Sequence, residues 1–314
     1  MKRFLVRRLL FYLPVMLLVT IIVFSLVFLL PGDPAVMLLG EEADPKLLEL
    51  YRKELGLDRP IPVQYAAWLG GVFTGDWGRS LRTQEKILVE LRNRLPVTLQ
   101  LGLLGFALSL LIAIPIGMFT ASRPNTVGDT AGTLFAIGGV AIPDFWAAVM
   151  LIYLFAVILG WLPAGGYVGF FDDPVQNMKT MALPVFVLGF EQSAGVMRQT
   201  RSSMLDVLRQ DYIRTAHAKG LGESVVLVRH ALKNAFIPVL TILGLRVAIM
   251  LGRTAIIETI FGLPGVGRFA VTGVTQLDLP VVQGVLLLSG TVVILANLAT
   301  DILYGFLDPR IRYT

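Results

Sequence analysis

The sequence PVTLQLGLLGFALSLLIAIPIGMFTA occupies residues Pro96–Ala121 and contains no charged side chain. A helix needs about 20 mostly apolar residues to cross a hydrocarbon core about 30 Å thick, so this stretch predicts a transmembrane helix. Two further uninterrupted apolar runs of sufficient length are Leu9–Leu30 and Leu279–Thr300. Three interrupted apolar runs lie at Thr130–Gly160, Thr180–Met197 and Ala235–Ile257. We therefore expect an all-α integral membrane protein with six transmembrane helices.

The composition supports this class. Of 314 residues, 55% are hydrophobic and 16% are charged, whereas soluble domains have about 25% charged residues. The mean hydropathy is +0.73. These values exclude a disordered chain, a collagen-like repeat and a disulfide scaffold. The chain has no cysteine, which excludes thiolate catalysis, iron–sulfur clusters and cysteine-bound zinc, and we expect neither a metal nor a cofactor.

The charges predict the orientation. Lys2, Arg3, Arg7 and Arg8 precede the first span, and positive charge favours the cytoplasmic side. The first apolar run is longer than the ~7–15-residue core of a signal peptide, so we interpret it as a retained span. An even number of spans places both termini in the cytoplasm. The inside segments 1–8, 122–129, 198–234 and 308–314 then hold 14 Lys and Arg against five acidic residues. The outside segments 31–95, 161–179 and 258–278 hold 11 Lys and Arg against 14 acidic residues.

The basic pI of about 9.6 follows from this bias, so no nucleic-acid partner is expected, because such a role needs a soluble basic face. The sequence divides into 1–30 with the cytoplasmic N-terminus and span one, 31–95 as a small extracytoplasmic lobe, and 96–314 as a five-span core. Asp44-Pro45 predicts a helix start within the lobe. The lobe is interpreted either as a folded cap on the span ends or as a docking surface, and its aromatic residues Tyr65, Trp68, Phe73 and Trp77 as a core or an interfacial belt.

The inside loop 198–234 contains a short predicted helix. Asp211 is suited to the N-cap position and Gly220 to the position after the C-terminus, with Tyr212 to Lys219 between them. A helix of two turns is not stable alone in water, because nucleation is costly, so it must pack against something. It could lie on anionic membrane lipid or dock into a soluble partner, and the pattern alone does not separate these alternatives.

This loop resembles the coupling loop of permease subunits of dipeptide/oligopeptide ABC importers. The resemblance covers almost the whole chain in order, and its motifs are Pro31-Gly32-Asp33-Pro34, Glu54–Pro60, Arg201–Leu205, Asp211–Leu221, His230–Ala235, Glu258–Phe261 with Pro264-Gly265, and Asp308–Arg312. It is closest to the first of the two permease types, which has a long outside loop after span one. Arg214-Thr215-Ala216 stands where the general importer motif has Glu-Ala-Ala. This departure resembles the peptide branch of the family and so points to that subfamily.

The resemblance implies a type I ABC importer permease fold and a set of partners. These are a second permease subunit in a heterodimer, two ATP-binding subunits, an extracytoplasmic substrate-binding protein and membrane lipid. It also implies that the short helix couples the permease to an ATP-binding subunit, through Tyr212, Ile213, Arg214, Thr215, Ala216, His217, Ala218, Lys219 and Gly220. The implied cargo is a di- or oligopeptide, and relatives of this kind carry nickel complexes, glutathione or oligosaccharides.

Ionisable residues within spans are costly and usually mark function. Glu191 and Arg246 fall at similar depth in spans four and five, so they predict an interhelical ion pair or a contact to a charged substrate in the pathway. Arg253 lies nearer the outside, where snorkelling suffices. Asp144 follows Pro143, so we expect the third span to be kinked or broken there, with Asp144 satisfying freed backbone groups.

The chain lacks the Gly-x4-Gly-Lys-Ser/Thr loop that cradles phosphates, so we expect no ATPase activity in this subunit. The glycines at Gly262, Gly265 and Gly267 follow an apolar helix, and we interpret them as a re-entrant turn. A secondary transporter would show inverted repeats and a channel a filter segment; the sequence favours neither. The predicted function is that of a transport subunit, and the predicted location is the cell membrane, which the chain crosses several times.

Overall fold

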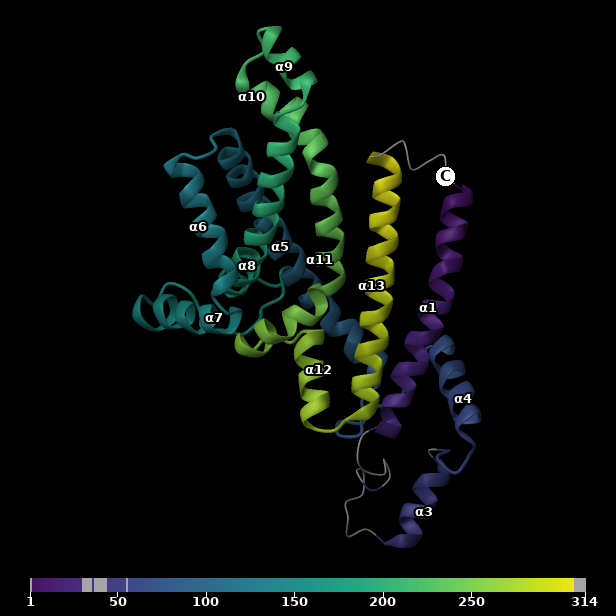
Figure 1. The fold of residues 1–314 in the computed structure, drawn as a ribbon. Coiled ribbons are helices and arrows are strands. Elements are labelled where there is room, and N and C mark those ends of the chain that lie inside the picture. Colours follow the sequence, from purple (N-terminus) through teal and green to yellow (C-terminus); the bar gives the residue numbers. More distant parts are fainter. Residues whose placement is uncertain (1, 30–35, 37–43, 55, 308–314) are drawn as a thin grey trace. The chain divides into compact units, whose positions relative to one another are not determined.

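The computed structural model describes residues 2–29, 36, 44–54 and 56–307 (Figure 1). Within these helices, some side chains are not described, and Arg246 is one of them. The described elements are helical: α1 (Lys2–Leu29), α3 (Pro45–Glu54), α4 (Ile61–Thr74), α5 (Ile87–Ser122), α6 (Val127–Ala141), α7 (Asp144–Ile152), a π-helical segment (Tyr153–Ile158), α8 (Pro174–Leu208), α9 (Asp211–Ala218), α10 (Glu223–Val225), a second π-helical segment (Val226–Leu232), α11 (Lys233–Ile260), α12 (Val266–Thr275) and α13 (Leu279–Leu307). One isolated antiparallel bridge joins Arg79 and Lys86. The predicted all-α class is confirmed.

Three described helices are long and apolar enough to cross a membrane: α5, α8 and the Leu279–Ile302 part of α13. Two bent helix pairs pass the same test, so the number rises to five if each pair is one span. The apolar part of α1, Leu10–Leu26, is shorter. Six spans therefore stay a prediction, with α1 as the span in question.

The expected break in the third span is present. α6 ends at Ala141, and Ile142 and Pro143 both have extended backbone before α7 begins at Asp144. The axis turns by 95° between α6 and the segment Asp144–Ile158, as the kink between α6 and α7 in Figure 1 shows. Proline disfavours helical backbone at the residue before it, which explains why the helix stops at this point.

Two expected boundaries differ in the structure. α8 continues to Leu208, so the first part of the predicted inside loop 198–234 is a helical extension of span four. The fifth span was expected over Ala235–Ile257, with Pro238 near its start, but helix already starts at Glu223 and continues through the π-helical segment. Pro238 therefore lies inside a helix, where it removes a backbone hydrogen bond, and the chain bends there by 48°.

The chain divides into two compact units. The first contains Thr98–Leu263 and the chain from Ala296 onward, and the second contains Lys2–Val97 and Pro264–Leu295. This division follows packing, and the segment boundaries at residues 30 and 95 stay sequence-based predictions.

Small residues let the helices of the first unit approach closely. A Cβ added at Gly189 of α8 would lie 2.9 Å from the Gly105 carbonyl oxygen of α5, and one at Gly132 of α6 would lie 2.4 Å from Thr120. Such close backbone approach is how helices associate in a membrane, where lipid tails are as apolar as leucine. α5, α6 and α8 consequently share a buried core with α11 that includes Ala113, Ala136, Ala194, Met197 and Val239.

The segments predicted to lie outside meet at one end of the first unit. The Gly166 N–H donates to the Phe261 carbonyl at 2.8 Å. The Tyr167 hydroxyl donates to Gln100 Oε1 at 3.0 Å, and Gln100 in turn donates to Asn177 at 2.6 Å. Burial, and then the charge of nearby Asp172, raise the pKa of the Tyr167 phenol, so the hydroxyl keeps the proton that it donates.

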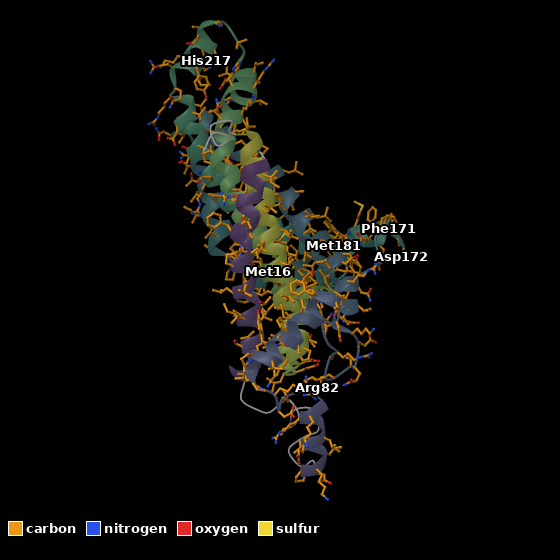
Figure 2. The ribbon with its side chains drawn as sticks, turned by 90° about the vertical axis from the view of Figure 1, so that its right-hand side faces the viewer. Met16, Arg82, Phe171, Asp172, Met181 and His217 are labelled. Atoms are coloured by element: carbon orange, nitrogen blue, oxygen red, sulfur yellow. The ribbon has the colours of Figure 1, made fainter. Side chains whose placement is uncertain are left out.

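The opposite end of the first unit carries α9 and α10. Figure 1 shows these helices beyond the ends of α8 and α11, whereas α7 lies at the other end. In Figure 2, His217 marks the α9 end, and Phe171 and Asp172 lie far from it. The predicted inside and outside segments of this unit thus separate to its two ends.

The second unit packs α4 against α1. Phe24 of α1 contacts the rings of Tyr65 and Trp68, with centroids 5.4 and 5.8 Å apart, and the hydroxyls of Thr20 and Tyr65 share a hydrogen bond of 2.8 Å. Trp77 packs beside a core formed by Ile87, Leu91, Val266, Val281 and Val285. Phe73 is 83% exposed, so it is not part of an aromatic core, and the alternative of an interfacial belt stays a prediction. At the start of α3, Asp44 Oδ1 accepts from the Lys46 N–H at 2.9 Å, as predicted for a helix cap.

Candidate coupling site

The predicted short helix is present as α9, and one of its faces is fully packed. Ile213 is 1% exposed and Ala216 is 6% exposed. They belong to a core cluster with Ala121 at the end of α5, Met204 of α8, Val226 and Ala231 of the second π-helical segment, and Ala235 of α11. Because an eight-residue helix cannot persist alone in water, this packing, chiefly on the π-helical segment, is what stabilises α9.

The other face of α9 is open. Arg214 exposes 76% of its side chain, and Tyr212 is 41% exposed. The remaining exposed residues of α9 and its C-cap are Asp211, Thr215, His217, Ala218 and Lys219. A surface of one aromatic ring, two permanent cations and small residues, fixed on a packed base, is suited to dock into a complementary groove.

The ends of α9 differ by one residue from those expected. Gln210 occupies the N-cap position and Asp211 lies in the first turn, while Lys219 is the C-cap. The Asp211 carboxylate lies 3.5 Å from Arg214 on the exposed surface and still interacts favourably with the helix N-terminus. Gly220 has φ +75°, the left-handed conformation predicted for the residue after the helix.

The chain after α9 leads into α11 through a π-helical segment. Val226–Leu232 is π-helical, and Val226 and Ala231 in it are buried against α9. The Asn234 side-chain amide donates to the Tyr212 hydroxyl at 2.8 Å. α9 is thus connected both to α8, which precedes it, and to α11, which follows.

The predicted pair of Glu191 and Arg246 cannot be placed, because the Arg246 side chain lies outside the described residues. Glu191 instead forms an ion pair with Arg253 of α11. Snorkelling was expected to account for Arg253, but its guanidinium is directed to a carboxylate on the neighbouring helix. Asp144 interacts electrostatically with both residues, and no backbone hydrogen bond of its side chain is found among the described residues, so its expected role at the kink is not supported.

The family models match both parts of the chain. A family described as the binding-protein-dependent transport system inner membrane component matches residues 113–313. A second, described as the N-terminal part of such membrane components, matches residues 1–102. The chain belongs to this permease family. It is a transmembrane permease of the ABC importer type and a multi-pass protein of the cell membrane, as the resemblance predicted.

Relatives of this permease carry names from peptide transport. A relative from Brucella abortus (strain 2308), named as a peptide transport system permease protein, is 44% identical over 96% of each chain. A dipeptide transport system permease protein from Alkalihalophilus pseudofirmus is 40% identical over the full length of both chains. A glutathione transport system permease protein from Salmonella choleraesuis is 38% identical, again over the full length of both.

The permease contains an ion pair that the sequence reasoning missed. Arg201 of α8 donates to both carboxylate oxygens of Asp129 in α6, from Nε at 2.7 Å and from Nη2 at 2.8 Å. The signal for it was Thr126, whose side chain accepts from the Asp129 N–H and marks a helix start. Arg201 was recognised only as part of a motif, and its partner depends on how α6 and α8 pack.

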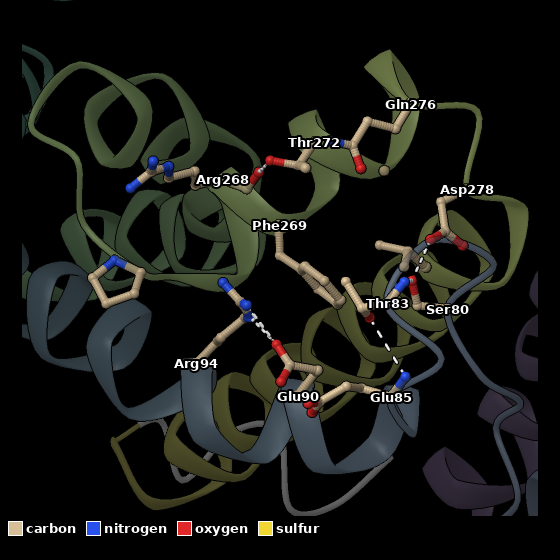
Figure 3. Close-up of a pocket in the computed structure, with 13 residues that line it drawn as sticks. Ser80, Thr83, Glu85, Glu90, Arg94, Arg268, Phe269, Thr272, Gln276 and Asp278 are labelled. Carbon is tan, nitrogen blue, oxygen red and sulfur yellow. Dashed lines mark hydrogen bonds and ion pairs between the residues drawn. The ribbon is translucent and has the colours of Figure 1, made fainter.

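The permease also has a pocket in its second unit, with a cavity volume of about 460 Å³ (Figure 3). Arg94 is paired with Glu90 and stacks over the Phe269 ring at 4.5 Å. Beside it, buried Asp278 accepts from the Ser80 hydroxyl and from the Leu81 N–H at 3.1 Å. These bonds fix the segment that contains the Arg79–Lys86 bridge. No cluster of potential metal ligands occurs among the described residues.

Proposed function

We propose that this permease forms half of the translocation path of an ATP-driven, binding-protein-dependent importer for di- and oligopeptides. Its partners are a second permease, two ATP-binding subunits and an extracytoplasmic binding protein. The observation that carries the proposal is α9, which has a buried face on the first unit and an exposed face with no covering element among the described residues.

In this proposal α9 transmits movement. Closure of the ATP-binding subunits on ATP displaces the groove in which α9 sits. Since Ile213 and Ala216 share one core cluster with residues of α5, α8, the second π-helical segment and α11, α9 does not slide alone and carries the ends of these helices with it. Packed interfaces of this kind switch between discrete arrangements, which would convert an inward-facing path to an outward-facing one.

The proposed topology has six spans, counting α1, with both termini and α9 in the cytoplasm and the lobe 31–95 outside. It is supported by the charge bias of the segments and by the separation of the predicted inside and outside segments of the first unit (Figure 2). This subunit has no ATPase function in the proposal, since hydrolysis belongs to its partners.

Peptides are proposed as cargo because most of the names among close relatives refer to peptide transport. Glutathione is the second candidate, and one observation favours it: a relative matching the full chain is named as a glutathione permease. The two are separated by competition, in which unlabelled di- and tripeptides or glutathione are tested against uptake of a labelled dipeptide by the complete importer.

The coupling proposal is tested by reversing the charges of Arg214 and Lys219 on α9. Arg214→Glu with Lys219→Glu is expected to lower recovery of the ATP-binding subunits with the tagged permease, or to leave ATP hydrolysis without uptake. The matched control is Lys179→Glu, an exposed cation on α8 that lies in a predicted outside segment; it should leave both measurements unchanged. Intact assembly and uptake in the α9 variant would contradict docking and favour a helix on anionic lipid.

A further inference from the structure

The ion pair of Asp129 and Arg201 joins the first turn of α6 to the C-terminal part of α8 with the two-bond geometry of a guanidinium and a carboxylate. Two parallel charge-assisted bonds fix the relative orientation of both side chains, which a single bond does not. The Asp129 side chain is 8% exposed and that of Arg201 is 29% exposed, so water competes weakly for the pair.

Asp129 is also held by hydrogen bonds to the residues that directly precede α6. Its Oδ2 accepts from the Asn125 N–H at 3.0 Å, and its own N–H donates to the Thr126 hydroxyl at 3.3 Å. Asn125 has φ +63°, a conformation tolerated by asparagine, which turns the chain so that this N–H reaches the carboxylate. The start of α6 is therefore attached to Arg201 through a carboxylate that cannot rotate freely.

Arg201 lies on the same stretch of α8 that supports α9. Met204, three residues later, is fully buried in the cluster that contains Ile213 and Ala216. One helical turn of α8 thus contributes Met204 to the core cluster that contains α9 and, through the Arg201 ion pair, contacts the start of α6. α6 then runs to the 95° bend that precedes α7.

We propose that the Asp129–Arg201 ion pair is a positioning contact that makes the start of α6 move with the end of α8, so that a displacement of α9 reaches the bend between α6 and α7. This inference rests on the proposed role of α9 in coupling. In the importer, the pair would be needed for productive transport per ATP, and the complex would assemble without it.

The first measurement uses the complete importer reconstituted with its binding protein. Asp129→Asn is expected to leave the recovered complex and its ATPase rate in place while uptake per ATP falls at least about fivefold, the lower end of typical allosteric coupling. Arg201→Lys keeps the charge but cannot form the two-bond geometry, so an intermediate loss is expected. Arg123→Gln is the control, because it removes a cation of the neighbouring loop that contacts only the Phe119 ring among its described interactions.

The second measurement follows the two helices directly. The chain has no cysteine, so spin labels can be attached specifically to Val127→Cys and Ser202→Cys, both exposed positions. In the assembled importer the distance between the labels should be the same with and without a non-hydrolysable ATP analogue. With Asp129→Asn added, the distance should differ between these two states or its distribution should broaden.

Three outcomes overturn the inference: unchanged uptake per ATP in Asp129→Asn, a loss of uptake that only matches a loss of recovered complex, or a label distance that changes with nucleotide in the parent importer. If Asp129→Asn cannot be recovered, Arg201→Lys and the parent label distance still decide. Failure of the parent permease to assemble with ATP-binding subunits would instead contradict the proposed function.

Discussion

Asp278 shows how a single residue determines local structure in the second unit. It is 2% exposed, and its carboxylate accepts from the Ser80 hydroxyl and the Leu81 N–H. Burying a charge is unfavourable unless it is hydrogen-bonded, so these donors are what make a carboxylate acceptable here.

Replacing Asp278 with asparagine should destabilise this segment. Ser80 and Leu81 donate to different oxygens of Asp278, and the amide of Asp278→Asn has one oxygen only, so its N–H₂ group faces one of the two donors. We expect a loss of about 1–3 kcal/mol, seen as a lower Tm of the purified permease. Asp76→Asn is the control, because exposed Asp76 accepts only from the Gly78 N–H, at 3.2 Å. Equal Tm values for the two variants would contradict this role.

A glycine on α8 gives a second test at the residue scale. Alanine at Gly189 would place its Cβ 2.9 Å from the backbone oxygen of Gly105, which cannot move aside as a side chain can. We expect Gly189→Ala to cost about 1–3 kcal/mol through separation of α5 and α8. Gly138→Ala on α6 meets no atom within 4 Å and should be neutral or stabilise by about 0.5–1 kcal/mol; thermal unfolding of both variants compares them.

At the scale of elements, α8 organises the first unit. It packs against α6, α7 and α11, and it carries the charged contacts Glu191 and Arg201 to two of them. The two pairs lie at different positions along α8. The Glu191–Arg253 pair lies near the middle of α8, and the Asp129–Arg201 pair lies nearer the end that leads to α9.

The Glu191–Arg253 pair should behave as one coupled unit. Glu191→Gln leaves Arg253 without its partner, and Arg253→Gln leaves Glu191 near the like charge of Asp144. Each single change should lower the amount of folded permease recovered, whereas the double change should recover more than either, with a coupling of about 0.5–3 kcal/mol. Normal recovery with altered transport in Glu191→Gln would show that the pair serves the pathway instead.

At the scale of the whole molecule, the orientation in the membrane can be measured directly. Single cysteines at His217 and Phe171 can be labelled specifically in a chain without native cysteine, and Phe171 is 97% exposed. A membrane-impermeant maleimide added to intact cells should label Phe171→Cys, and His217→Cys should react only after the membrane is opened. Labelling of both positions from the same side would contradict the proposed topology.

The membrane class, the apolar runs and the helix α9 could be predicted from the sequence, because each depends on local composition and spacing. Apolar runs such as Pro96–Ala121 must be helical to satisfy their backbone in lipid, Pro143 ends α6 through local sterics, and Gly220 is suited to a left-handed turn. The bend at Pro238 and the helix α12 were not predicted, because both depend on where helices begin and end, and sequence patterns locate those positions only to within a few residues.

Only the tertiary structure decided which charged residues meet. Arg201 and Asp129 are far apart in sequence, as are Arg253 and Glu191, and their pairing depends on how α8 packs against α6 and α11. The same holds for the buried face of α9, because its pattern fitted a helix on anionic lipid as well as one that docks into a soluble partner. Which distant segments meet depends on which helix faces the small residues allow to pack together. The spacing of residues along the sequence does not contain the distances between those faces.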